Sequence, residues 1–544
     1  MTNFTRREII KAFLGSSVTM LGCSRSKTGR MPDGKFVGPS HLLGHKLRDG
    51  LRVEPAKDAW KTVDIAIVGG GVSGLAAAWK LKREGFNNFV LFEIEANPGG
   101  TAQSGTNSFI SYPWGAHYLP VPQKENQELL SLLDEMNLLE GRDQTGEPIV
   151  AEQFLCRDPE ERVFFRGRWY EGLYLRVGAS QNDLEQFENF QKEIDYWVAW
   201  RDNKGRKAFT IPVANSSDDA EVTALDKLSI AQYLSKKGFN SSRLLWYIDY
   251  ACRDDYGTRL EDTSAWAAIF YFTSRMKEPR QQAQPLITWP EGNGKLISHL
   301  YNRVKDNVRL STTVTDIVAV DKEKGGHIDV TTLNSLTEEA FGFHAKKVIF
   351  AAPHFLTKYM LRHYKEATPN YLSNFDYGSW MVANLTLRDR PSSTGFPLCW
   401  DNVLYESPSL GYVVATHQAG IDRGQTVFTY YYPLCDTDTR KARNRLLSIN
   451  WDEWADVILT DLSRAHPDIR DLVDRIDIMR WGHAMIRPKP GFIWSGSLQQ
   501  ASQPSKGIHF ATSDLSGVAL FEEAFYHGTR AAREVLTSLA DYSL

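Results

Sequence analysis

The sequence is poor in cysteine, has no excess of charge of either sign and contains no long apolar run. Its 544 residues include only five cysteines, and because no two of them form a CxxC pair, a disulfide scaffold is not expected. The 63 basic and 66 acidic side chains leave a net charge of −3 and form no long Lys/Arg block, so the sequence shows no electrostatic footprint for nucleic acid. After residue 30 no stretch approaches the roughly 18 consecutive apolar residues of a membrane span. The 13 histidines are scattered, and we expect no metal site.

The amino terminus combines a basic start with a short apolar stretch. Arg6 and Arg7 precede about a dozen weakly apolar residues at 12–22, too few to span a bilayer but typical of an export signal. The arginine pair resembles the twin-arginine signal, which a receptor reads, and the residues ending at Cys23 resemble a lipoprotein cleavage box. We therefore expect residues 1–23 to direct export to the periplasm by the twin-arginine machinery, with Cys23 as a candidate lipid anchor. The alternative is an amphipathic helix with a buried cysteine.

Residues 24–58 contain several Pro and Gly among polar side chains. This composition is typical of a linker. We expect the segment to hold the folded body away from the membrane.

A glycine motif follows a β-forming run at residues 62–68 and precedes a helical stretch at 75–84. Gly69, Gly71 and Gly74 have the GxGxxG spacing of a dinucleotide-binding turn. The first glycine permits the tight turn, the second lets the backbone approach a pyrophosphate, and the third allows close packing of the helix. The amino terminus of that helix, which includes Ser73, offers N–H groups to the anion.

An acidic residue completes this pattern. Glu93 ends the next predicted strand, at 88–93, and lies 24 residues after Gly69. A carboxylate there accepts the hydroxyls of an adenosine ribose. Strand, glycine motif, helix, strand and acid together predict a Rossmann-type domain, whereas a glycine motif alone would be weak evidence.

The residues after Glu93 point to a particular family. Gly99 and Gly100 follow six residues later, and the arrangement resembles the flavin-dependent amine oxidase superfamily, which includes phytoene desaturases and protoporphyrinogen oxidases. The resemblance implies that the Gly pair lines the FAD pyrophosphate and flavin. Members usually carry Arg next, where this chain has Thr101.

Further segments extend the resemblance over most of the chain and imply additional cofactor contacts. Gly115 and Ala116 resemble the loop that passes near the isoalloxazine, the adjoining His117 is expected to face the substrate, and Val314 matches a valine on the adenine side. Near the carboxyl terminus Asp514 occupies the place of the acid that binds the ribityl chain.

The last helix, which contains Ala524, matches the family's flavin-facing helix. A helix amino terminus aimed at the flavin stabilises the anion formed on reduction. Glu523 replaces a family glycine there, and its charge would oppose that stabilisation unless the side chain points away. The alternatives are that the helix only packs and that Asp514 only caps a helix.

The substrate side resembles the family less closely. Trp481 and Phe492 lie where amine oxidases place aromatic residues against the flavin, and an aromatic wall offers a cation–π face to an amine. Family members generally have a lysine near flavin N5, where this chain has Val382 or a neighbour that is not lysine. The carboxyl-terminal region lacks Ser-Gly-Gly-Cys, so we expect FAD to be bound noncovalently.

We therefore expect an α/β fold in which a Rossmann-type FAD-binding domain is interleaved with an α+β substrate domain. The FAD-binding domain is assigned to 59–121, 285–355 and 479–544, and the substrate domain to 122–284 and 356–478. The resemblance implies oxidation of an amine C–N bond by hydride transfer to flavin N5, with oxygen or a quinone or other carrier as acceptor. The alternatives are desaturation of an apolar substrate and a flavin-binding protein without turnover.

Overall fold

The computed structural model describes residues 31–281, 283–320, 326–435 and 438–540. The predicted export signal, with Arg6, Arg7 and Cys23, lies outside the described residues. In the described chain no helix is both long and apolar enough to cross a membrane.

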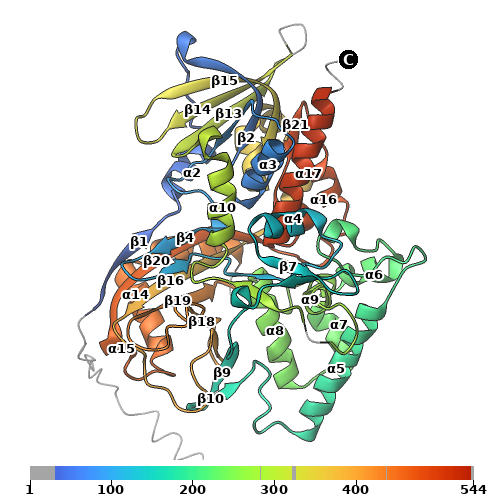
Figure 1. Ribbon diagram of the computed structural model, residues 1–544, viewed down its shortest axis with the longest axis vertical. Helices are drawn as coiled ribbons and strands as arrows, with labels where there is room; N and C mark the ends of the chain where they lie inside the picture. The colour runs from blue at the N-terminus through green and yellow to red at the C-terminus, as the bar shows by residue number, and fades with distance from the viewer. Residues whose placement is uncertain (1–30, 282, 321–325, 436–437, 541–544) are drawn as a thin grey trace, which may run out of the picture.

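The first large sheet contains seven strands and carries the glycine motif. Its strands are β12 (Val308–Arg309), β3 (Phe89–Phe92), β2 (Trp60–Val68), β15 (Ala340–Phe350), β14 (Ile328–Asn334) and β13 (Thr312–Ala319), with β21 (Ile508–Phe510) beside β15. The pairs around β2 are parallel, whereas β13, β14 and β15 pair antiparallel. This sheet lies at the top of Figure 1.

The carboxyl-terminal half of strand β2, Ile65–Val68, is buried and apolar on both faces of the sheet. Ile65 and Ile67 point into one hydrophobic core and Ala66 and Val68 into another, because successive side chains of a strand face opposite sides of the sheet. The first core is covered by α3 (Val72–Arg83), α10 (Gly294–Val304) and α17 (Phe521–Ala540). The part of a parallel strand that is buried on both faces is expected to be apolar, as these four residues are.

The second large sheet has eight strands and lies at the lower left of Figure 1. Its order is β1 (Asp33–Val37), β20 (Val473–Ile486), β16 (Tyr377–Leu387), β19 (Thr426–Pro433), β18 (Gly411–Val414), β17 (Asp401–Leu404), β9 (Glu161–Phe165) and β10 (Arg168–Glu171). The helices α13 (Thr439–Ser448), α14 (Trp451–Leu462) and α15 (Ile469–Leu472) belong to the same lobe.

A helical group completes the substrate side, at the lower right of Figure 1. It consists of α5 (Gln181–Ala199), α6 (Ala220–Ala224), α7 (Ile230–Lys236), α8 (Ser242–Tyr256) and α9 (Ala265–Thr273). Helix α5 begins with a capping box, in which Ser180 and Asp183 bond to each other's backbone N–H.

The remaining elements are α2 (His41–Arg48), α4 (Gln127–Glu135), α11 (Thr357–Met360), α12 (Arg362–Glu366), α16 (Ser497–Ser502) and the short strand pairs β4 (Ser104–Thr106) with β5 (Ser111–Pro113), β6 (Tyr118–Pro120) with β11 (Leu286–Thr288), and β7 (Leu139–Arg142) with β8 (Pro148–Val150).

Two expected boundaries are wrong. The described part of segment 24–58 is not a linker, because β1 pairs in parallel with β20 and α2 follows it. The polar composition of this segment did not indicate a strand, because β1 is an edge strand whose side chains remain partly exposed. The boundary between residues 478 and 479 falls inside β20, which continues unbroken to Ile486.

Candidate active site

A cavity of about 440 Å³ runs between the two large sheets. One end is lined by the glycine motif and the carboxyl ends of β2 and β3, and the other by side chains from β16, β19 and β20. Ligands of open α/β sheets bind at the carboxyl ends of the strands, so the first end is the expected nucleotide site.

The glycine motif leaves space for a ligand at one glycine and none at the others. A Cβ on Gly74 would lie 1.9 Å from the Gly69 carbonyl oxygen, and Gly69 itself has φ of +103°. A Cβ on Gly71 would meet nothing within 4 Å, and Gly71 and Ser73 line the cavity. No side chain caps α3, so its first N–H groups are available to an anion. The third glycine therefore serves packing, and the second faces the ligand space.

Glu93 lines the cavity and holds the glycine turn in place. Its Oε2 accepts a hydrogen bond from the backbone N–H of Gly70 at 2.6 Å, and its Oε1 accepts one from the N–H of Glu95 at 2.9 Å. Burial raises the pKa of Glu93 to about 7. A carboxylate oxygen accepts more than one hydrogen bond, so both oxygens retain capacity for ribose hydroxyls.

The Gly99–Gly100 pair packs against the Gly69–Gly74 turn. The N–H of Gly99 donates to the Gly70 carbonyl at 2.8 Å, and Gly99 has φ of +118°, a left-handed conformation that favours glycine. Gly115 approaches Thr101 so closely that a Cβ would lie 2.2 Å from the Thr101 carbonyl. The predicted residues Gly99, Gly100, Thr101, Gly115, Ala116 and Val314 all line the cavity.

An amino-terminal strap covers part of the nucleotide end. The strap, residues 33–48, crosses from the eight-stranded sheet to the glycine-motif sheet, and its Pro39 and Leu47 line the cavity. The backbone N–H and hydroxyl of Ser40 donate to the Glu95 carboxylate at 2.7 and 2.9 Å. The strap thus connects the two sheets beside the ligand space. The linker interpretation did not predict these contacts.

Asp514 lines the cavity and also joins two segments of the protein. Its Oδ2 accepts hydrogen bonds from the His354 backbone N–H at 2.8 Å and the Tyr377 hydroxyl at 2.7 Å. Burial raises its pKa above the usual value. Asp514 is therefore more than a local helix cap, because its carboxylate connects β16 with the turn after β15.

At the start of α17, the Glu523 side chain points away from the cavity, so its charge does not face the flavin space. Its carboxylate is fully buried and accepts hydrogen bonds from the Val213 N–H at 2.8 Å and the Ser516 hydroxyl at 2.5 Å, and Glu523 does not line the cavity. Its neighbour Glu522 does, together with Ala524. Burial raises the pKa of both Glu522 and Glu523 to about 7.

The substrate end is walled by aromatic side chains from three neighbouring strands. Trp481 lies opposite Trp380 and donates its indole N–H to the Trp114 carbonyl at 2.8 Å. The Tyr431 hydroxyl donates to the Gly115 carbonyl at 2.9 Å, which connects this wall to the loop beside the nucleotide end. His117 packs against Tyr431 with 4.9 Å between ring centroids, and burial lowers its pKa to about 4, so the imidazole is neutral at pH 7.

Phe492 is not part of this wall. Its side chain is buried in the hydrophobic core beside Phe375, with 5.2 Å between ring centroids, and it does not line the cavity. The Gly491 that precedes it has φ of +78°, which lets the chain turn there. Val382 does line the cavity, and no lysine or cysteine is among the described residues that do.

Sequence reasoning missed a charged group at the substrate end. Asp254, Asp255 and Arg275 line the cavity, and Asp255 pairs with Arg275 at 3.0 Å. Asp254 makes no hydrogen bond or ion pair within the described chain, and burial, followed by the charge of Asp255, raises its pKa to about 7. The only available signal was an Asp-Asp pair inside the aromatic helix α8.

The chain resembles known flavoproteins in sequence and fold. The model of the flavin-containing amine oxidoreductase family matches residues 72–536.

The chain belongs to this family.

Solved structures with a similar fold include a putrescine oxidase variant, with a TM-score of 0.63, 16% identity, and coverage of 88% of this chain and 100% of that one. Cyclohexylamine oxidase from Brevibacterium oxydans IH-35A has a TM-score of 0.58 and 14% identity over 88% of this chain and 99% of that one. Protoporphyrinogen oxidase 2, chloroplastic/mitochondrial, of Arabidopsis thaliana is 40% identical over 76 residues, and this chain spans about 14% of its length.

The flavin-containing oxidoreductase fold confirms the predicted two-domain α/β architecture and its FAD cofactor. The residues present fit that group, because Gly71 leaves an open cradle beside an uncapped helix and Glu93 and Asp514 line the same cavity. With no cysteine lining the described cavity, noncovalent binding fits as well. The protein is an FAD-dependent oxidoreductase, as expected, so the alternative of a binding protein without turnover is not retained.

Proposed function

We propose that this enzyme oxidises the C–N bond of an amine that carries a second positive charge. The supporting observation is Asp254, a carboxylate without an ion-pair partner among the described residues, at the aromatic end of the cavity. Burial and then the charge of Asp254 raise the pKa of the nearby Tyr431. A buried carboxylate favours a cationic partner.

The apolar and the charged side chains of the cavity suit different ends of such a substrate. FAD, when bound, accepts a hydride from the substrate carbon. The reacting nitrogen must be neutral for that transfer, and the apolar wall with Trp481 and Val382 favours a neutral amine. Asp254 favours an ammonium group instead, so it suits a distal nitrogen of the same substrate.

An anaerobic reduction experiment tests this proposal. A diamine should bleach the flavin absorbance at lower concentration than a monoamine of equal length, and Asp254→Asn should weaken diamine binding about 10- to 100-fold. The exposed Glu188→Gln on α5 makes the same charge change away from the cavity and should have no effect. Equal use of both amines, or an unaffected Asp254→Asn enzyme, would contradict the assigned substrate.

Desaturation of an apolar substrate is the second candidate. It is supported by Val382 in the wall, where amine oxidases generally carry lysine, and by the partial sequence match to a protoporphyrinogen oxidase. Bleaching by an apolar substrate but by no amine would favour it. Reoxidising the reduced enzyme with oxygen or with a quinone then identifies the acceptor.

We further propose export by the twin-arginine route to the periplasm and lipid attachment at Cys23. The support is the sequence alone, since these residues lie outside the described ones. Replacing Arg6 and Arg7 by Lys should retain the protein in the cytoplasm, as cell fractionation would measure. Cys23→Ala should release it from the membrane, and a soluble wild-type protein would overturn the lipid anchor.

A further inference from the structure

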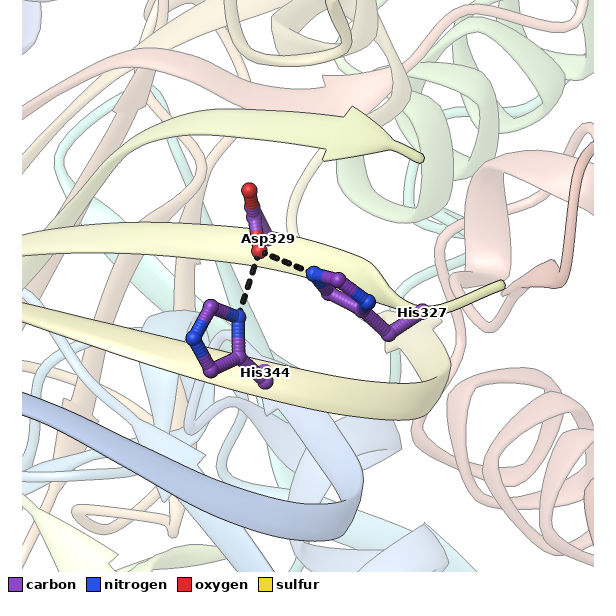
Figure 2. A group of neighbouring side chains, drawn as sticks. All are labelled: His327, Asp329 and His344. Carbon is purple, nitrogen blue, oxygen red and sulfur yellow. Dashed lines mark hydrogen bonds and ion pairs between the residues drawn. The ribbon is translucent and has the colours of Figure 1, made fainter. Parts of the chain in front are cut away.

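The outer hairpin of the glycine-motif sheet brings together three side chains that sequence spacing did not connect. Asp329 is in β14, His327 immediately precedes that strand, and His344 is in β15. Residues two apart in an extended chain point to the same face, and the register places Asp329 directly opposite His344. All three side chains therefore project from one face, as Figure 2 shows.

Their polar atoms converge on one point. Nδ1 of His344 lies 2.7 Å from Oδ1 of Asp329, and Nε2 of His327 lies 3.0 Å from the same oxygen. The three atoms lie within 4.8 Å of one another. A tetrahedral ion with bonds of about 2.0–2.1 Å separates its ligand atoms by about 3.3 Å, so small rotations of these side chains are sufficient to admit one.

The surroundings favour a fixed but accessible site. The three side chains are 27–39% exposed, which leaves room for water in a remaining coordination position. The His344 ring stacks on Trp60 with 4.6 Å between centroids, and this contact restrains its orientation. Lys346, on the same face of β15, pairs with Asp64 at 2.8 Å, so its positive charge is balanced.

We propose that His327, Asp329 and His344 form a binding site for a divalent transition-metal ion of the zinc class. Two imidazole nitrogens and one carboxylate oxygen are ligands that zinc accepts, and copper and nickel also favour imidazole. The ion replaces the contacts through the Asp329 oxygen, and each neutral imidazole then carries its single proton on the ring nitrogen that does not bind the ion, so the proton leaves the metal-binding nitrogen by tautomer exchange with water. None of the three residues lines the FAD cavity. The ion therefore links β14 to β15 outside the catalytic centre.

Zinc titration of the chelator-treated, FAD-loaded enzyme tests the site. Isothermal calorimetry should detect one equivalent of Zn²⁺ that His327→Ala or His344→Ala weakens by more than the roughly 10- to 100-fold typical of losing an outer-shell partner. The control is the double variant His41→Ala/His45→Ala, because these histidines lie four residues apart on α2 and offer another pair. Loss of binding in the control with retention in His344→Ala would overturn the proposal.

A second readout separates metal binding from misfolding. Zinc should raise the melting temperature of the wild type but not that of Asp329→Asn, while both proteins keep the same FAD content. Cu²⁺ bound beside Trp60 should quench its fluorescence, so Trp60→Phe should show less quenching than the wild type. Equal thermal shifts in wild type and Asp329→Asn, or equal quenching with and without Trp60, would contradict the site.

Discussion

The two ends of the cavity are built from different parts of the chain. At the nucleotide end the backbone of Gly69 to Gly74, the adjoining Glu93 and the Gly99–Gly100 pair come from about thirty consecutive residues. At the substrate end Asp254, Trp481 and Tyr431 come from three distant segments. The motif-built part of the cofactor site is thus local in the sequence, whereas the substrate end, like the cofactor residues Val314 and Asp514, depends on side chains from distant segments. Substitutions should therefore affect FAD at one end and amine turnover at the other.

Gly71→Val should have the largest effect at the nucleotide end. A Cβ at this position meets no protein atom within 4 Å, so the apoprotein should keep its melting temperature while FAD affinity falls by roughly 100-fold or more, because the side chain fills the pyrophosphate space. FAD titration of the apoprotein and a thermal melt measure the two quantities.

Gly74→Ala is the matched comparison. Its Cβ would lie 1.9 Å from the Gly69 carbonyl, so this smaller change should lower the apoprotein melting temperature itself. Normal FAD content in Gly71→Val would contradict the placement of the pyrophosphate.

Asp514→Ala should weaken FAD about 10- to 100-fold through loss of a charge-assisted hydrogen bond. It should also lower the apoprotein melting temperature, because Tyr377 and the His354 N–H lose their acceptor. Tyr377→Phe removes the hydroxyl that donates to Asp514 but keeps the Asp514 carboxylate, so it should weaken FAD less than Asp514→Ala does. Equal FAD affinity in wild type and Asp514→Ala would remove this residue from the cofactor site.

Glu93 should make FAD binding depend on pH. Burial raises its pKa to about 7 in the free protein, and hydroxyl donors stabilise the charged form, so binding releases a proton. Affinity should then rise with pH by at most about ten-fold per unit below pH 7 and level off above it. Titrations between about pH 5.5 and 8.5 measure this, and Glu93→Gln should bind more weakly but without that slope.

Tyr431→Phe should have the smallest effect and tests whether the two ends of the cavity act independently. It removes one hydrogen bond to the Gly115 carbonyl, worth about 1 kcal/mol, or about five-fold in kcat/KM if the bond positions the wall. FAD affinity should remain within about two-fold of the wild type. A larger loss of FAD than of turnover would show that the two ends are not separable.

Local patterns predicted most of the nucleotide end. The strand at 62–68, the helix after Gly74 and the strand before Glu93 appear as β2, α3 and β3, because each has an unambiguous apolar period and glycine punctuation. The strap and the position of Phe492 were mispredicted. Edge pairing of a polar strand and the inward turn after Gly491 depend on partners far away in the chain.

Local sequence is sufficient to predict a dinucleotide site at a Rossmann turn, because that site consists of backbone geometry that only glycine at fixed spacing permits. Three features depend on how the chain packs: Glu522 and not Glu523 faces the cavity, Asp254 lies there without an ion-pair partner in the described chain, and β14 and β15 align His327, Asp329 and His344. The physical reason is that a side chain's burial and charge partners are set by the elements packed around it, and local sequence does not contain them.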